Sequence, residues 1–255
     1  MKVVILAGGY GTRLSEMTKD IPKPLVKIAE KPILMHIMDH FSKYNHNEFI
    51  IATGYKSEEI KRYFLNFNQL NSDYKINLKS GNIEILNANT YDWNVSPIYT
   101  GLNTMTGGRL KRLNKFINDE TFLLTYGDAV SNVDINSLIE FHKSHGKMVT
   151  LTAVNKRSQF GQLDLEGNLI KTFKEKPGLD NNWINGGYFV INSKFLDYIK
   201  DDETVLEREP LERVADMGEL MAFKHHGFWQ CMDSLKDLEQ LKDLWSKNLS
   251  FENDE

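Results

Sequence analysis

Apolar residues in the first quarter of the chain fall into two patterns, continuous runs and helical spacing. The runs at 3–7 and 49–52 predict buried strands, because neither strand face has polar positions. After Pro32, apolar residues recur every three to four positions, which predicts a helix with that proline in its first turn. Ser57 is predicted to cap the next helix, whose acidic first turn suits the helix dipole.

The same alternation returns after residue 120. Further strands are predicted at 121–126, 148–154, 188–191 and 228–232, and a hairpin at 163–170 around Gly167. Asp134 and Asp233 stand where N-caps belong, so helices are predicted after both, the second over 234–245. Strands that alternate with helices predict an α/β fold with a largely parallel sheet.

The segment 65–100 breaks this regularity. It is rich in asparagine and other polar residues, with strand-like fragments at 83–86 and near Tyr99. We interpret it as short strands inserted into a single domain over 1–255, and as a candidate surface for assembly into a homo-oligomer. Residues 234–255 are expected to form the C-terminal helix and tail.

Composition narrows the class of protein. The chain has 255 residues, a formal charge of -4 and one cysteine. This charge gives no general attraction to nucleic acid or to an anionic membrane. A single cysteine excludes an internal disulfide and a multi-cysteine zinc site. With no apolar run of membrane-spanning length, we expect a soluble, cytoplasmic protein.

The segment 6–24 carries the first chemical signal. The 3–7 run ends in Gly8-Gly9-Tyr10-Gly11, and glycines there let backbone amides approach phosphate oxygens. Two cations follow, Arg13 and Lys23, the second held between two prolines. A guanidinium and an ammonium suit a triphosphate whose negative charge is spread while a P–O bond breaks.

Two aspartates are candidate metal ligands. Asp128 follows Gly127 at the end of a predicted strand, where α/β sheets form their ligand crevice. Asp233 lies between a predicted strand and the last helix, where it serves as a cap, as a ligand or as both. Mg²⁺ bound to phosphates takes only one or two protein carboxylates, so Asp128 suits this role, although an aspartate after a glycine is equally typical of a turn.

Three other segments carry weaker signals. Glu175-Lys176 and Asn185-Gly186 suit a sugar hydroxyl and a phosphate, although taken alone a surface charge run and a bulged strand are the better explanation. Thr104 to Arg112 predicts a basic amphipathic helix with an anion at its N-terminus. His36 and His40 have i, i+4 spacing but lack a third ligand, so packing is the better interpretation.

Together these segments resemble the sugar-1-phosphate nucleotidyltransferases. Residues 6–14 and 22–24 match the signature Leu-Ala-Gly-Gly-x-Gly-Thr-Arg-Leu and Pro-Lys-Pro. Thr104 to Arg112 and Gly227 to Asp233 are similar to the glucose-1-phosphate cytidylyltransferase branch. The chain departs from that branch at Ala129, where a glycine is usual, and at 156–159, where Pro-Pro-Gly-Arg is usual.

The resemblance implies a doubly wound α/β domain with a mostly parallel mixed sheet (Rossmann-like) and a smaller sugar-binding subregion. It implies Mg²⁺-dependent transfer of a cytidylyl group from CTP to α-D-glucose 1-phosphate, for deoxysugar and surface polysaccharide synthesis. Its catalytic cations would be Arg13 and Lys23, and its metal ligands Asp128 and Asp233. Its nucleotide contacts would be Leu6, Ala7, Gly8, Gly9, Gly11, Thr12, Thr104, Arg109 and Gly127. Its sugar-phosphate contacts would be Tyr126, Glu175, Lys176, Asn185 and Gly186.

Several alternatives stay open on the sequence. Thymidylyl and uridylyl transferases share the N-terminal signature, and the altered 156–159 segment leaves another sugar or polyol phosphate possible. A nucleotide-binding oxidoreductase would explain the strand and glycine turn, but Leu14 occupies the third glycine position of a dinucleotide fingerprint. A non-catalytic nucleotide sensor would have kept the fold without turnover.

Overall fold

The computed structural model describes residues 1–88, 90–118, 120–155, 162–166, 169–174 and 183–247. Its centre is a seven-stranded sheet in the order β14-β10-β13-β8-β1-β4-β7. These strands are β14 Leu220–His225, β10 Val149–Asn155, β13 Trp183–Ile191, β8 Phe122–Tyr126, β1 Val3–Ala7, β4 Glu48–Thr53 and β7 Asn94–Tyr99.

The direction of the strands confirms the predicted mixed, mostly parallel sheet. Strand β1 pairs in parallel with β4 on one side and β8 on the other, while β13 is antiparallel to both β8 and β10. The chain order therefore reverses between β1 and β8. Ligand crevices of doubly wound sheets form at such a switch point, beyond the carboxyl ends of the strands.

Two hydrophobic clusters explain why these strands are apolar throughout. Along β1, Val3 and Ile5 belong to one cluster, and Val4 and Leu6 to the other. Side chains of a strand alternate between faces, so each cluster covers one face of the sheet. Both faces of the sheet are thus buried, which explains why every residue of β1 is apolar.

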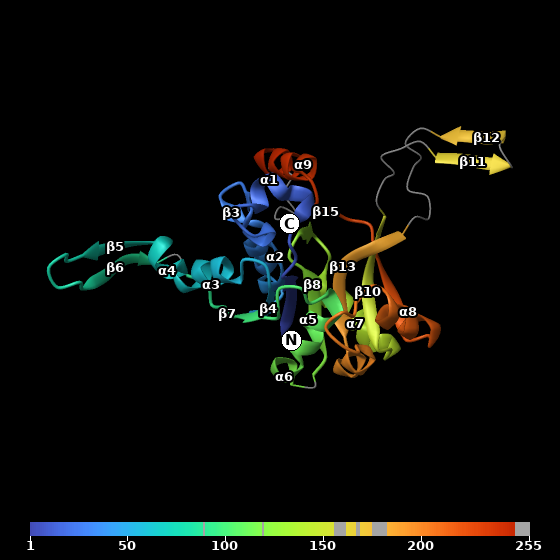
Figure 1. The fold of residues 1–255 in the computed structure, drawn as a ribbon, viewed down its shortest axis with the longest axis horizontal. Helices are drawn as coiled ribbons and strands as arrows, with labels where there is room; N and C mark the ends of the chain where they lie inside the picture. The colour runs from blue at the N-terminus through green and yellow to red at the C-terminus, as the bar shows by residue number, and fades with distance from the viewer. Residues whose placement is uncertain (89, 119, 156–161, 167–168, 175–182, 248–255) are drawn as a thin grey trace.

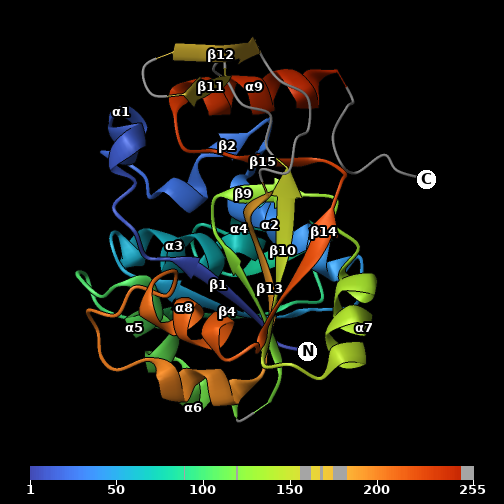
Figure 2. The ribbon, with the colours of Figure 1, turned by 90° about the vertical axis from the view of Figure 1, so that its right-hand side faces the viewer.

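Helices cover each cluster. The first face carries α2 Ile33–Ser42, α3 Ser57–Leu65, α7 Ile135–His145 and α9 Leu235–Ser246. The second carries α5 Thr106–Arg112, α6 Asn114–Ile117, α8 Glu209–Asp216 and the 3₁₀ turn Ser193–Tyr198. Figure 2 shows α7 and α8 on opposite sides of strands β10 and β13. None of the described helices has the length and apolar character needed to cross a bilayer.

Short elements complete the fold. They are α1 Ser15–Thr18, α4 Phe67–Leu70, β2 Lys27–Ile28, β3 Lys31–Pro32, β9 Ala129–Ser131, β15 Trp229–Cys231 and the 3₁₀ turns Thr12–Leu14 and Lys23–Leu25. The predicted hairpin is confirmed as the antiparallel pair β11 Gln162–Glu166 and β12 Leu169–Lys174.

The predicted helix starts are only partly correct. Asp134 caps α7 as predicted, accepting from the Ser137 amide at 2.7 Å. The N-cap of α9 is instead Ser234, which forms a capping box with the carboxylate of Asp237. Ser57 is the first residue of α3 rather than its cap. Asp233 therefore lies one residue before the actual N-cap. Its side chain does not cap the helix and is available to the site.

The segment 65–100 divides into two parts. Strands β5 Ser72–Ile76 and β6 Ile83–Ala88 form a two-stranded ribbon that projects from the body (Figure 1). The fragment near Tyr99 instead belongs to β7, the edge strand of the main sheet, paired in parallel with β4. Two short strands of this segment thus form the ribbon, whereas the strand near Tyr99 is part of the main sheet.

Candidate active site

The glycine turn after β1 is held in shape by two glycines for different reasons. Gly11 has φ +64, a left-handed conformation that strains residues with a Cβ. Gly8 lies against the guanidinium of Arg109, where a Cβ would come within 2.3 Å of a nitrogen. At Gly9 an added Cβ would meet nothing within 4 Å, so this residue faces open space.

Arg109 lies behind this turn rather than on the surface of α5. The residue is 5% exposed, and its guanidinium donates to the carbonyls of Gly101 at 2.6 Å and Leu102 at 3.1 Å and to the Thr100 hydroxyl at 2.9 Å. Burial lowers the pKa of Arg109 below its ordinary value. Arginine remains charged in proteins, so these oxygens surround a buried cation beneath Gly8.

The start of the helix within Thr104 to Arg112 does not bind an anion in the way that the sequence predicted. Helix α5 has seven residues, and the amides of Gly107 and Gly108 donate to the Thr204 carbonyl at 3.0 and 3.2 Å. These donors are already satisfied by the chain and are not directed at a ligand. Thr104 itself is buried and lines the cavity described below.

Lys23 is the centre of the charged part of the site. It begins a 3₁₀ turn between two prolines, and its ammonium lies 2.7 Å from Asp128 and 2.8 Å from Asp233. Its side chain is 12% exposed. Burial lowers the pKa of Lys23, but the two carboxylates outweigh this effect and raise it above its ordinary value.

The sheet explains how two aspartates 105 positions apart meet. Strands β9 and β15 pair antiparallel with Ala129 opposite Cys231, and the Met232 amide donates to the Asp128 carbonyl at 2.8 Å. Asp128 precedes one strand and Asp233 follows the other, so both lie at the same end of the pair. Because Ala129 is not among the described residues with positive φ, its methyl group is tolerated where the branch usually has glycine.

The two carboxylates fit a magnesium ion. They converge on one ammonium, which marks a position where a cation is stabilised by hard oxygen donors. No cluster of three or more candidate metal-ligating side chains occurs among the residues that the structure describes. Further ligands would therefore be phosphate oxygens and water, the usual arrangement for Mg²⁺ on nucleotides.

Arg13 contacts Asp233 at 3.1 Å and is otherwise open to solvent, with a side chain that is 77% exposed.

A cavity of about 460 Å³ opens between the glycine turn, the start of α5 and the end of β8. Its lining contains most of the predicted nucleotide contacts: Leu6, Ala7, Gly8, Gly9, Gly11, Thr104, Arg109 and Gly127, together with Lys23, Tyr126 and Asp128. Thr12 follows directly in the 3₁₀ turn Thr12–Leu14.

Sequence reasoning missed Tyr10 and Asn103, which also line the cavity and share a hydrogen bond of 2.6 Å. Their position beside Gly9 and Thr104 was the only available signal.

Tyr126 connects the cavity to the predicted sugar residues. Its ring packs on Gly187, whose Cβ would lie 2.7 Å from the ring and whose φ is +80. Burial raises the pKa of Tyr126, as does Glu207, whereas a hydrogen bond from Asn185 lowers it. Asn185 lies beside this contact, since its side-chain oxygen accepts from the Gly187 amide at 2.8 Å, and the Gly186 carbonyl accepts from the Trp229 indole at 2.7 Å. Glu175, Lys176 and the altered 156–159 segment lie outside the described residues.

The predicted packing role of the histidine pair is confirmed. Both side chains are buried, with His36 bonded to the Ile28 carbonyl at 3.0 Å and His40 to the Val133 carbonyl at 2.8 Å. Burial lowers the pKa of His40 to about 4. A neutral, carbonyl-bonded imidazole is a core residue here.

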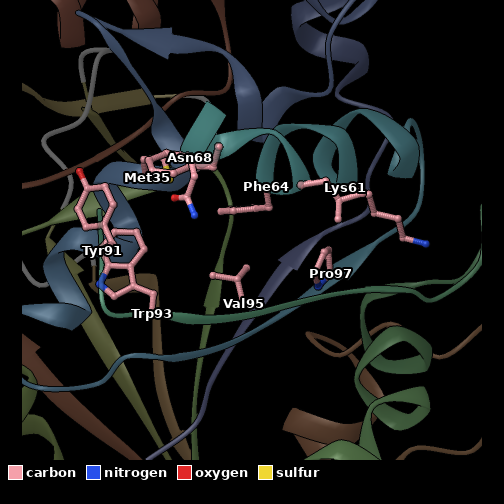
Figure 3. Close-up of a pocket in the computed structure, with 10 residues that line it drawn as sticks. Met35, Lys61, Phe64, Asn68, Tyr91, Trp93, Val95 and Pro97 are labelled. Atoms are coloured by element: carbon pink, nitrogen blue, oxygen red, sulfur yellow. The ribbon is translucent and has the colours of Figure 1, made fainter. Parts of the chain in front are cut away.

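A second cavity of about 480 Å³ has different chemistry (Figure 3). It lies between α3, α4 and the chain leading into β7, with Tyr91 stacked on Trp93 at 4.0 Å between ring centroids. Of the described residues that line it, only Lys61 is charged. An apolar, aromatic lining with one cation does not suit a triphosphate with its metal, so the first cavity is the candidate active site.

Comparisons with known proteins agree with this geometry. The model of the nucleotidyl transferase family matches residues 2–253. The chain belongs to that family. Among nucleotidyl transferases, the glucose-1-phosphate cytidylyltransferase of Salmonella typhi is 49% identical over 248 residues, which cover 97% of this chain and 96% of that protein. A probable glucose-1-phosphate cytidylyltransferase of Bacillus subtilis (strain 168) is 44% identical over 97% of both chains.

A solved structure supports the fold of this nucleotidyl transferase. HddC from Yersinia pseudotuberculosis superposes with a TM-score of 0.70 at 24% sequence identity, covering 96% of this chain and 99% of that one. At this identity the likeness concerns the fold alone. It confirms the predicted Rossmann-like architecture.

Proposed function

We propose that this chain transfers the cytidylyl group of CTP to α-D-glucose 1-phosphate and releases pyrophosphate. The proposal depends chiefly on two relatives of that name, which are 49% and 44% identical over almost the entire chain. The site supports it through the glycine turn, Lys23 and Asp128, which line one cavity, and through Asp233 and Arg13, which form ion pairs next to them.

The reaction requires one displacement at phosphorus. A phosphate oxygen of the sugar phosphate attacks the α-phosphorus of CTP, and the bond to the β-phosphate oxygen breaks. The attacking oxygen is already anionic, so no general base is needed. Positioning and charge neutralisation then supply most of the rate.

Each charged residue has a role in this scheme. Lys23 and Arg13 would neutralise the triphosphate and the departing pyrophosphate. Asp128 and Asp233 would hold Mg²⁺, which when bound neutralises phosphate charge and fixes the geometry of the displacement. Because Lys23 now bridges both aspartates, we expect its ammonium to exchange these partners for phosphate oxygens when CTP and metal bind.

The nucleotide contacts divide between the turn and the residues behind it. The segment Gly8 to Thr12 offers backbone amides to phosphates and base, with Leu6, Ala7, Thr104 and Gly127 on the adjacent walls. Arg109 acts from beneath Gly8, where it holds the turn and adds positive potential to the cavity. Glu175, Lys176, Asn185 and Gly186 remain our predicted sugar-phosphate contacts beside Tyr126.

A homo-oligomer and a cytoplasmic location also belong to this proposal. The ribbon β5–β6 exposes Tyr74, Ile76, Ile83, Ile85 and Leu86, and isolated two-stranded ribbons are marginally stable in water. Contact with a second copy would cover these side chains, and a light-scattering mass equal to one chain would contradict it. A lone cysteine suits a reducing compartment.

The test is pyrophosphate release in Mg²⁺ with CTP, dTTP, UTP, ATP and GTP against a panel of sugar and polyol 1-phosphates. We expect the highest kcat/KM for CTP with glucose 1-phosphate. A preference for dTTP or UTP would move the assignment to another branch of the family. Activity with CTP and a different phosphate would retain the chemistry and change the acceptor, and tight nucleotide binding without turnover would favour a sensor.

A further inference from the structure

Glu207 lies beside the cavity and belongs to none of the sequence motifs. Its two carboxylate oxygens accept separate hydrogen bonds, from the Tyr126 hydroxyl at 2.5 Å and from the Thr106 hydroxyl at 2.7 Å. Both hydroxyl residues line the cavity. A carboxylate therefore links the end of β8 to the start of α5 at the edge of the candidate active site.

The loop that carries Glu207 is fixed in place by its backbone. The amides of Met105 and Gly107 donate to the carbonyls of Asp202 and Thr204 at 2.8 and 3.0 Å. The Leu206 amide donates to the Thr106 hydroxyl at 2.9 Å, which leaves the proton of that hydroxyl for Glu207. The carboxylate is thus held by a network and does not depend on one flexible contact.

This network determines which way the Tyr126 proton points. An ionised carboxylate can only accept, so Tyr126 donates its single proton to Glu207 and directs it away from the cavity. With its one proton committed to Glu207, the phenol oxygen can offer a ligand only a lone pair, so Tyr126 can act towards a ligand only as an acceptor.

We infer that Glu207 is a positioning residue that makes Tyr126 a hydrogen-bond acceptor for a sugar hydroxyl. A sugar hydroxyl can donate to that lone pair, whereas a fully ionised phosphate has no proton to give and is repelled. The inference rests on the proposed function, and it assigns Tyr126 to the hexose ring and not to the phosphate of the sugar phosphate.

The test compares Glu207→Gln, Tyr126→Phe and the double variant, with Glu203→Gln as control. Glu203 is an exposed glutamate of the same loop. We expect Glu207→Gln and Tyr126→Phe each to raise KM for glucose 1-phosphate about five- to tenfold, as the loss of one hydrogen bond predicts. KM for CTP should stay within about twofold, and the double variant should be no worse than Tyr126→Phe.

Substrate analogues give a second measurement that needs no Glu207 variant. Among the 2-, 3-, 4- and 6-deoxy analogues of glucose 1-phosphate, one should lose a similar factor with the unaltered enzyme but not with Tyr126→Phe. Additive losses in the double variant, equal changes in KM for both substrates, or no analogue with this pattern would overturn the role of Glu207. An unaltered enzyme that is inactive with glucose 1-phosphate would overturn both this inference and the proposed function.

Discussion

The two ends of the candidate active site are built in different ways. At the phosphate end, Arg13, Lys23, Asp128 and Asp233 form ion pairs of 2.7 to 3.1 Å. At the proposed sugar end, Tyr126 donates to Glu207 and packs its ring on Gly187. In the proposed function, substrate and metal would rearrange the charges of the first end, whereas Tyr126 at the second end would already have the orientation that recognition requires.

This difference assigns distinct kinetic effects to the two ends. Charges that act on the breaking P–O bond stabilise the transition state more than the ground state, so their loss lowers kcat. Hydrogen bonds to a non-reacting hydroxyl are made in both states, so their loss raises KM. The following experiments test this division, in order of expected effect.

The strongest test removes the central charge of the phosphate end. Lys23→Met should lower kcat by about 10²–10³-fold, the range found when one transition-state donor is lost. Lys27→Met, at an exposed lysine four residues along, is the matched control and should keep its rate. Steady-state pyrophosphate release measures both. A Lys23→Met enzyme that is altered only in KM would contradict the claim that the charges of the phosphate end act on kcat.

The metal half of the phosphate end can be tested by titration. Asp128→Asn and Asp233→Asn should each raise the Mg²⁺ concentration for half-maximal activity by about 10–100-fold, because each removes a proposed anionic ligand. Asp20→Asn is the control, since that aspartate is exposed. Mg²⁺ curves that do not move in either variant would remove these residues from the metal site.

The packing beneath the phosphate end can be tested with two adjacent glycines. Gly8→Ala places a methyl group against the Arg109 guanidinium and should cost about 1–3 kcal/mol of unfolding free energy. Gly9→Ala meets nothing within 4 Å and should leave that free energy unchanged. Urea unfolding separates the two. Equal effects would mean that Arg109 moves aside freely and does not hold the turn.

The stability of the protein also depends on pH through a core histidine, His40, which belongs to neither end of the site. The pKa of buried His40 is lowered to about 4 from 6.5, so the unfolded state binds more protons between these values and stability falls as the pH falls. We expect His40 to contribute about 2 kcal/mol to the loss from pH 7 to pH 5. Urea unfolding at both pH values should show a smaller loss for His40→Gln than for His226→Gln, the exposed control. Equal losses would mean that His40 makes no such contribution.

The same contrast explains what the sequence could predict. The phosphate end is encoded by contiguous motifs, so Gly8, Arg13, Lys23 and Asp128 were identified from local patterns. Sequence spacing did not predict that Arg109 is buried under Gly8, because tertiary contacts to residues 100–102 decide it. Glu207 carried no local signal, since its role comes from a loop packed against α5.

The fold shows a similar limit. Buried strands such as β1 and β8 were predicted because both faces are apolar. The edge strand β7 was assigned to the insertion because its exposed side and Pro97 disguise its pairing with β4. The caps of α3 and α9 were misplaced by one residue. At α9 two capping residue types, Asp233 and Ser234, stand side by side, whereas α3 is capped by Lys56, a residue type that sequence patterns do not favour there.

The most direct test of the account is to follow CTP, glucose 1-phosphate and Mg²⁺ with the unaltered protein by phosphorus NMR. We predict CDP-glucose and pyrophosphate in equal amounts, and neither product once the metal is chelated. Pyrophosphate that accumulates with CMP, or no change in either substrate, would contradict a cytidylyl transfer at this site.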